Sequence, residues 1–246
     1  KRLAGWAGTG KSLVISYLLN NCIEIFPSDM KFRDICVCTY TWKAALVLRS
    51  RNVNASSIHS VLYDVEIVDK EPIFVRRDPS LIREDYCMFI VDEASMVDST
   101  MRADLESVGI PVLYVGDSGQ LSPISNDPKD ATFMQKAEFQ LTEIRRQALD
   151  SPIIRLSMDI RNGKFIPYGK YGDGVFKVTA SDISDTILQK TDQVLCGKNI
   201  TRSQLNRRIR RINGYDVNRM PVEGETLIGL NNLPQRFVFN GMQYKT

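Results

Sequence analysis

The chain reads GWAGTGKS from Gly5 to Ser12, and this stretch determines the fold. It satisfies the pattern G-x-x-x-x-G-K-[ST]. It stands between strand-like residues 1–4 and a segment from Leu13 onward in which apolar residues recur with helical spacing. In such a loop the glycines let backbone N–H groups face phosphate oxygens at a helix N-terminus. The sequence therefore predicts a nucleoside triphosphate site.

The residues of this loop have separate expected roles. The phosphates are expected to contact Gly5, Gly8, Thr9, Gly10 and Lys11. Lys11 is expected to reach the β and γ phosphates, and the Ser12 hydroxyl is expected to bind Mg²⁺. A plain glycine-rich turn is the alternative, but the order of strand, loop and helix favours phosphate binding.

Short apolar runs recur outward from the loop. Residues 35–40, 87–91 and 112–115 are typical of strands buried on both faces of a parallel sheet, and residues 43–49 are typical of a helix. Strands that alternate with helices predict an α/β fold. Polar residues 69–72 separate two β-like runs, so we expect an inserted β-hairpin at about residues 63–77.

A second α/β unit is expected from residue 143. Ser151 and Pro152 are typical of a helix start, Asn162-Gly163 is typical of its end, and residues 172–174 indicate a turn. Further strands are expected at residues 175–178, 194–196 and 226–230. Thr201 and Gln204 predict a capping box for an Arg-rich helix that ends at Gly214.

Composition excludes several classes of protein. The 246 residues are 43% hydrophobic and 25% charged, which is typical of a globular chain, and the net charge of +3 does not by itself argue for nucleic acid. The single histidine excludes multi-His metal sites, and the five cysteines contain no C-x-x-C pair. The odd cysteine count favours reduced thiols, and no membrane segment or leader is visible, so we expect a cytoplasmic protein.

Polar residues follow two of the predicted strands. Asp92 and Glu93 follow one strand, and Gln120 lies in the cluster Gly116-Asp-Ser-Gly-Gln120 after the next. Carboxyl ends of parallel strands gather ligands at one edge of a sheet. Asp92 therefore suits Mg²⁺ and Glu93 suits water activation. An isolated Asp-Glu after an apolar run is more often a solvated strand end. Gln120 is either a γ-phosphate sensor or an ordinary turn residue.

The motifs follow one another in the order GWAGTGKS, TWKAA, SIHS, VDEAS, GDSGQLSPI, LTEIRRQ and KNITRSQLN. In order and spacing the chain resembles superfamily one helicases of the RecD-like branch, which includes phage Dda-type enzymes. The resemblance covers nearly the whole chain. It implies a P-loop NTPase with a RecA-like lobe at residues 1–142, which carries the hairpin, followed by part of a second RecA-like lobe at residues 143–246.

The resemblance also implies an activity. Helicases of this branch couple ATP hydrolysis to 5′ to 3′ movement on single-stranded DNA and to duplex unwinding, with ATP and Mg²⁺ as cofactors. The implied partners are single-stranded or forked DNA and proteins of replication or recombination, with no membrane. We take a monomer in a bacterial or phage-infected cell as the working expectation.

Matching positions imply individual roles. The implied catalytic residues are Lys11, Glu93, Gln120 and Arg146, the last with Gln120 at the γ-phosphate. Ser12 and Asp92 are implied for Mg²⁺. The implied nucleic-acid contacts are Thr41, Lys43, His59 and Arg202, and the hairpin is implied to separate strands.

Simpler explanations remain open for several of these features. His59 is also compatible with a loop histidine, the hairpin with a surface decoration, and the arginines at 202–211, which have no acid nearby in the sequence, with a solvated helix face.

The chain also departs from the family pattern. Tyr40-Thr41-Trp42 replaces Pro-Thr-Gly, Arg145 replaces an aromatic residue and Ser122 replaces a proline. The last family motifs, including an arginine that stabilises the transition state, are expected beyond Thr246. A nucleotide-gated nucleic-acid-binding fragment without turnover is therefore the alternative function, and a small-molecule kinase is a more remote one.

Overall fold

The computed structural model describes residues 1–21, 35–68, 71–144, 150–230, 236, 238 and 240–246. Its amino-terminal part is built on a six-stranded sheet in the order β3-β2-β6-β7-β1-β8, and every neighbouring pair is parallel. The strands are β1 (Arg2–Gly5), β2 (Ile35–Thr39), β3 (Ala55–Ser57), β6 (Met88–Asp92), β7 (Val112–Gly116) and β8 (Phe139–Leu141). The predicted α/β fold with a parallel sheet is confirmed.

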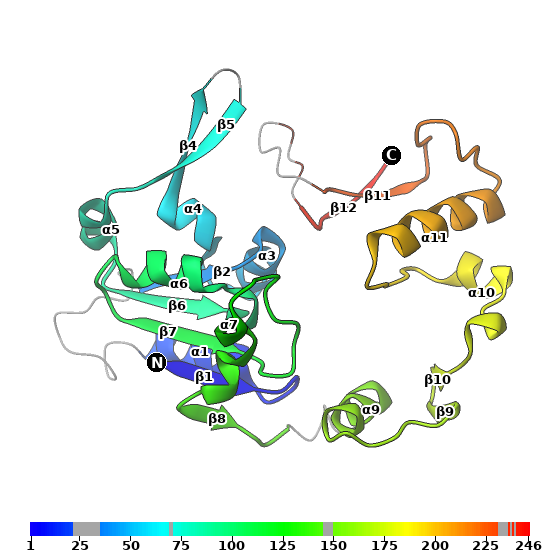
Figure 1. Cartoon of the computed structure of the whole chain (residues 1–246), viewed down its shortest axis with the longest axis horizontal. Coiled ribbons are helices and arrows are strands. Elements are labelled where there is room, and N and C mark those ends of the chain that lie inside the picture. The colour runs from blue at the N-terminus through cyan, green and yellow to red at the C-terminus, as the bar shows by residue number, and fades with distance from the viewer. Residues whose placement is uncertain (22–34, 69–70, 145–149, 231–235, 237, 239) are drawn as a thin grey trace.

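Helices cover both faces of this sheet (Figure 1). They are α1 (Lys11–Asn20), α3 (Trp42–Arg49), α4 (Ile58–Leu62), α5 (Pro79–Asp85), α6 (Ser99–Glu106) and α7 (Pro128–Thr132), with 3-10 turns η2 (Ala94–Met96) and η3 (Met134–Lys136). Among the described helices of the chain, none combines the length and the apolar character that crossing a bilayer requires.

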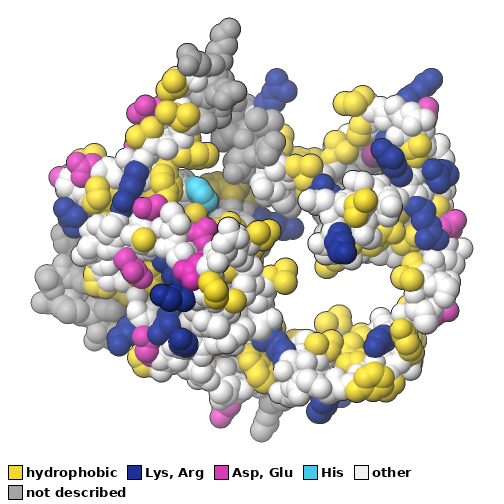
Figure 2. Space-filling model, in the orientation of Figure 1, with side chains coloured by type: hydrophobic (Ala, Val, Ile, Leu, Met, Phe, Trp, Pro, Cys, Tyr) yellow, Lys and Arg dark blue, Asp and Glu magenta, His cyan; other side chains and the backbone are white. Residues whose placement is uncertain are grey.

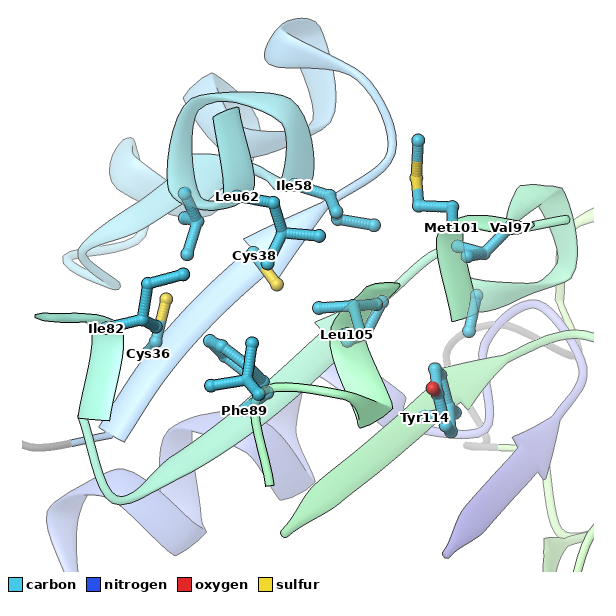
Figure 3. Packing of buried hydrophobic residues seen from close by; sticks show 14 of the residues in the cluster. Cys36, Cys38, Ile58, Leu62, Ile82, Phe89, Val97, Met101, Leu105 and Tyr114 are labelled. Carbon is cyan, nitrogen blue, oxygen red and sulfur yellow. The ribbon is translucent and has the colours of Figure 1, made fainter. Parts of the chain in front are cut away.

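Two hydrophobic layers explain why the central strands are mostly apolar. In β2, Cys36 and Cys38 pack with α4, α5 and α6 on one face, whereas Ile35 and Val37 pack with α1 and α3 on the other. Figure 3 shows the first layer, in which Phe89 of β6 lies fully buried. Side chains of successive strand residues point to opposite faces, so a strand covered on both sides is expected to be a nearly continuous apolar run.

The predicted hairpin is present and projects from the lobe (Figure 1). It consists of β4 (Tyr63–Val68) and β5 (Glu71–Arg76), which pair antiparallel. Its base is fixed to α6, because the Tyr63 hydroxyl donates a hydrogen bond to Asp104 and Arg76 lies 3.1 Å from a carboxylate oxygen of the same residue. Apolar side chains beyond this base, including Val65 and Ile67, are exposed.

The remainder of the chain runs as an arc beside the sheet (Figure 1). It contains α9 (Pro152–Arg161), β9 (Gly169–Gly172), β10 (Val175–Lys177), 3-10 turn η4 (Ala180–Asp182), α10 (Asp185–Lys190), α11 (Asn199–Ile212), β11 (Thr226–Ile228) and β12 (Gln243–Lys245). The strands described in this part form two antiparallel pairs, β9 with β10 and β11 with β12. The arc returns to α3, where the aliphatic part of Lys43 packs against Gly241.

Two local predictions in this part are wrong. Residues 194–196 form no strand, and Leu195 is 84% exposed, since none of the sheets in the described part of the chain includes this short apolar run. The Arg-rich helix begins at Asn199 and has Lys198 as its N-cap, so Thr201 lies inside the first turn and forms no capping box. Asn199 and Ile200 do not oppose helical geometry, which lets the helix extend past the expected cap. The boundary between residues 142 and 143 stays a prediction.

Candidate nucleotide and nucleic-acid site

Glycine is structurally required at three positions of the loop between β1 and α1. Gly8 and Gly10 have φ values of 81° and 91°, in the left-handed region that side chains disfavour. A Cβ atom on Gly5 would lie 2.5 Å from the Thr9 hydroxyl oxygen. That hydroxyl donates a hydrogen bond to the Trp6 carbonyl at 2.8 Å, which closes the loop. The result is a compact loop of the kind that surrounds a phosphate group.

Lys11 and Ser12 lie in the first turn of α1, directly after this loop. The Lys11 Nζ atom donates hydrogen bonds to the carbonyl oxygens of Gly5 and Trp6, at 2.8 and 3.1 Å. The ammonium is therefore held at the mouth of the loop, beside the N-terminal end of α1. Both features favour an anion at this position.

Asp92 and Glu93 lie at the carboxyl end of β6. Asp92 is 7% exposed and accepts a hydrogen bond from the Glu93 N–H at 2.9 Å. Glu93 has φ 56° and ψ 36°, a left-handed conformation that costs a non-glycine residue about 1 kcal/mol or more. This backbone geometry turns the chain sharply after the strand and sets the two carboxylates next to each other.

Burial changes the acidity of both groups. Burial raises the pKa of Asp92, and the Glu93 N–H and the Lys11 charge oppose that rise. Burial and the neighbouring Asp92 charge raise the pKa of Glu93, again against the Lys11 charge. Lys11 is thus within electrostatic reach of both carboxylates, so the structure brings together the residues that the sequence placed at one sheet edge.

Gln120 lies on the loop after β7, the strand between β1 and β6. Its side-chain oxygen accepts a hydrogen bond from the Ser95 hydroxyl at 3.3 Å, and hydrogen bonding by Gln120 also acts to lower the pKa of Glu93. Ser95, Asp117, Ser118 and Gln120 line a small surface cavity. Gln120 therefore lies near Glu93, as expected of a residue that contacts the same substrate.

Two residues of this region were not assigned a role from the sequence. Asp117 has a completely buried side chain and binds Arg161 of α9 through two hydrogen bonds, at 2.6 and 2.7 Å. Asp117 carried a weak signal, because it follows an apolar strand in the same cluster as Gln120. Arg161 carried none, since it lies 44 residues further on at the end of an ordinary amphipathic helix.

The nucleic-acid candidates Thr41, Lys43 and His59 follow β2 and β3, which are neighbours in the sheet. The Thr41 hydroxyl caps α3 by accepting a hydrogen bond from the Ala44 N–H at 3.2 Å. Lys43 is exposed. These positions place a hydroxyl and an ammonium group near the amino end of α3.

His59 lies among aromatic rings at the base of the hairpin. The centroid of its ring lies 5.8 Å from that of Tyr63, 6.0 Å from that of Phe74 and 6.4 Å from that of Tyr40. Burial lowers the pKa of His59, while the Asp98 charge acts to raise it. The histidine therefore connects the sheet edge with the inserted hairpin.

The arginines of α11 do not form an unpaired cluster. Arg210 binds Glu225 at 2.8 and 3.0 Å, and Arg208 lies 2.6 Å from Asp185. No acid lies within this helix in the sequence, and the fold supplies Glu225 and Asp185 from neighbouring segments. Arg202 is exposed on the same helix, over which Figure 2 shows several basic side chains. Arg146 lies outside the described residues.

The donor groups fit a nucleoside triphosphate with Mg²⁺. The Ser12 hydroxyl and the Asp92 carboxylate are oxygen ligands of the type that Mg²⁺ takes when substrate phosphates complete its shell. Within the ranges that the structure describes, there is no cluster of three or more His, Cys, Asp or Glu side chains that could hold a metal alone. The loop thus suits a metal that arrives with a nucleotide.

Comparisons with known proteins agree with this architecture. A family model described as an AAA domain matches residues 1–173. A Pif1 helicase from a study of forked duplex DNA unwinding by two coordinating helicases has a TM-score of 0.52 and 17% identity, over 98% of this chain and 65% of that one. Bacteroides Pif1 bound to single-stranded DNA has a TM-score of 0.50 and 19% identity, over 98% and 64%.

No curated protein matches the chain. The chain spans less than two thirds of the length of the two Pif1 helicases. At these low identities the structural similarity shows a shared fold alone. The family model covers well over half of the sequence. The chain therefore belongs to the AAA domain family, and its fold is similar to that of Pif1 helicases, in agreement with the resemblance of its motifs to superfamily one helicases.

Proposed function

We propose that this chain is the motor part of an ATP-dependent DNA helicase, which couples ATP hydrolysis to movement on single-stranded DNA. The observation that carries the proposal is the meeting of the phosphate loop with Asp92, Glu93 and Gln120 at the carboxyl edge of one parallel sheet. That arrangement joins a phosphate-binding loop to an acid pair and a polar sensor.

Each side chain has a role that follows from its surroundings. Lys11 would exchange its hydrogen bonds to loop carbonyls for bonds to the β and γ phosphates. Ser12 and Asp92 would hold Mg²⁺, which supplies charge neutralisation at the phosphates. Glu93, whose pKa is raised, is a stronger base than an ordinary glutamate and would accept the proton of the attacking water. Gln120 would orient that water or the γ-phosphate.

The residues proposed to contact DNA are chosen by their location in the fold. Thr41, Lys43 and His59 follow neighbouring strands, and the hairpin stands beside them. A basic group, hydrogen-bonding groups and aromatic rings in one region suit a single strand, whose phosphates and bases they can contact. Bacteroides Pif1, which shares the fold, was solved with single-stranded DNA. We propose 5′ to 3′ movement, with the hairpin at the fork.

ATP hydrolysis with and without single-stranded DNA tests the proposal. DNA should stimulate turnover, and Lys11→Ala should abolish it, whereas Lys164→Ala, an exposed surface change, should leave it unchanged. Duplexes with a 5′ or a 3′ single-stranded tail then test polarity, and only the 5′-tailed duplex should unwind. DNA-independent turnover would contradict the proposal.

A second function rests on Lys11, which hydrogen-bonds to carbonyls of its own loop, so that a bound phosphate would change the loop. It is a nucleotide-gated nucleic-acid-binding unit without turnover of its own. In that case a non-hydrolysable ATP analogue should change the affinity for single-stranded DNA, while hydrolysis stays at background. The two functions therefore give different results in the same pair of assays.

A further inference from the structure

Arg161 joins α9 to the nucleotide-site lobe through a pair of hydrogen bonds. Its Nη1 and Nη2 atoms lie 2.6 and 2.7 Å from the two carboxylate oxygens of Asp117. Asp117 comes directly after β7, whereas Arg161 is the last residue of α9 in the predicted second unit. A guanidinium that binds both oxygens of one carboxylate fixes their relative orientation as well as their distance.

Arg161 also contacts the phosphate loop and the loop of Gln120. Its guanidinium carbon lies 5.7 Å from the centroid of the Trp6 ring. A Cβ atom on Gly119 would lie only 2.5 Å from its Nη1 atom, so the guanidinium occupies the space beside that glycine. One side chain from α9 therefore touches the two loops on which Lys11 and Gln120 depend.

The position of Gln120 depends on Asp117. The carboxylate accepts a hydrogen bond from the Gly119 N–H at 2.9 Å, and the Asp117 carbonyl accepts one from the Gln120 N–H at 3.1 Å. Burial would raise the pKa of Asp117, but the hydrogen bonds from Arg161 and Gly119 outweigh it and lower that pKa below its usual value. The carboxylate is therefore ionised, and it keeps the turn that carries Gln120 closed.

We propose that Arg161 is a positioning residue that holds the Asp117–Gln120 turn against the phosphate loop and thereby couples α9 to the state of the nucleotide site. The coupling role rests on the proposed ATPase, whereas the positioning role does not. Loss of the paired hydrogen bonds between Arg161 and Asp117 should loosen the turn and displace Gln120. Movement of α9 would then no longer follow changes at the phosphates.

The first test compares Arg161→Lys with Arg155→Lys. The first change keeps the charge but cannot bind both oxygens. Arg155 lies on the same helix, is exposed and makes one 3.4 Å hydrogen bond to a backbone carbonyl, so it is a matched control. We expect Arg161→Lys to lower kcat for DNA-stimulated ATP hydrolysis about 10-fold while KM for ATP changes less than about 2-fold, and Arg155→Lys to change neither. A wild-type kcat in Arg161→Lys would overturn the coupling role.

The second test needs no turnover and separates the inference from the proposed function. Amide hydrogen exchange at Gly119 and Gln120 should speed up about 10-fold in Arg161→Lys, because their N–H groups bond to Asp117, and exchange in β6 should not change. Equal exchange in wild type and variant would overturn the positioning role, and so would faster exchange throughout the sheet, which indicates general destabilisation. Absence of hydrolysis in the wild type would contradict the proposed function alone.

A third measurement uses Trp6 as a reporter. In a Trp42→Phe background Trp6 is the one remaining tryptophan of the sequence. Its emission should shift in Arg161→Lys, since the cation beside the ring is displaced, and the response to added ADP should fall by at least about half. An unchanged emission and an unchanged response would overturn the contact between Arg161 and the phosphate loop.

Discussion

The Nζ atom of Lys11 lies 2.8 Å from the carbonyl oxygen of Gly5 and donates a hydrogen bond to it. The ammonium group is thus directed into its own loop, where a second carbonyl, that of Trp6, also accepts from it. A bound phosphate must compete with neutral carbonyl acceptors for these N–H donors. An ionised acceptor wins this competition, because the opposite charges of phosphate and ammonium attract each other in addition to the hydrogen bond.

Lys11→Ala should therefore weaken binding of ATP much more than binding of AMP. Loss of a hydrogen bond between charged groups costs about 1.5–3 kcal/mol, which is about 10- to 100-fold in affinity. AMP lacks the phosphates that Lys11 is expected to reach, so its affinity should change less than about 3-fold. Titration of fluorescent analogues of both nucleotides measures the two affinities. An equal loss for ATP and AMP would contradict contact between Lys11 and the β and γ phosphates.

Glu93→Gln should abolish hydrolysis and yet stabilise the fold at neutral pH. A lost general base lowers the hydrolysis rate about 10²- to 10⁴-fold. The pKa of Glu93 is raised, so the folded state holds its proton more tightly than the unfolded state, whose pKa is near 4.5. The contribution of Glu93 to the free energy of unfolding therefore falls as the pH rises from about 4.5 through the pKa of the folded state. A glutamine does not titrate, so the variant keeps its stability over this range.

Urea unfolding of wild type and Glu93→Gln at several pH values checks this prediction. The advantage of glutamine should be largest at pH 7 and should disappear toward pH 4. Asp85→Asn, an exposed change for which no such advantage is expected, provides the control. A glutamine variant that is less stable than the wild type at pH 7 would show that the Glu93 carboxylate stabilises the fold.

His59 should titrate below the usual histidine range of about 6.5. Burial among Tyr40, Tyr63 and Phe74 disfavours the charged ring, so its pKa is lowered, and the Asp98 charge opposes that effect. The folded state then binds fewer protons than the unfolded state below pH 6.5, so stability from this group is lost as pH falls. Asp98→Asn should lower the His59 pKa further, and the asparagine should still cap α6.

Proton NMR measures this pKa without overlap, because the chain contains one histidine. A midpoint above 6.5 would mean that the Asp98 charge outweighs burial. His59→Phe should flatten the dependence of stability on pH between about 5 and 7.

Arg102→Met should destabilise the fold by about 3 kcal/mol. Arg102 and Asp130 form an ion pair at 2.5 Å whose side chains are 10% and 1% exposed, so the change leaves a buried carboxylate without its partner. Lys164→Met breaks the exposed pair with Asp159, where the side chains are 63% and 37% exposed, and should cost less than about 1 kcal/mol. Urea unfolding compares the two, and equal costs would contradict the role of burial.

The first half of the chain could be predicted because local signals agree with its tertiary structure. The predicted strand at residues 35–40 is apolar from Ile35 to Cys38, and β2 (Ile35–Thr39) is indeed covered by helices on both faces. The glycines of the phosphate loop are dictated by local backbone geometry. Such features depend on neighbours in sequence, which is why periodicity and motif spacing found them.

The second half was less predictable because its pairings do not follow from the periodicity of apolar residues. Leu195 belongs to an apolar run that resembles a strand, but this run forms no strand and the Leu195 side chain is exposed. Arg210 owes its pairing to Glu225, across a turn that periodicity does not describe. The bond between Arg161 and Asp117 likewise depends on how the two parts of the chain meet.

The position of β1 in the sheet also has a consequence for the order of assembly. Leu3 is in register with Val115 on one side and with Phe139 on the other, so β1 is inserted between strands that are made more than a hundred residues later. Contacts this far apart in sequence form slowly. During synthesis the strand that leads into the phosphate loop therefore lacks its partner strands until β7 and β8 have been made. Nucleotide binding by a growing chain would thus report completion of the sheet.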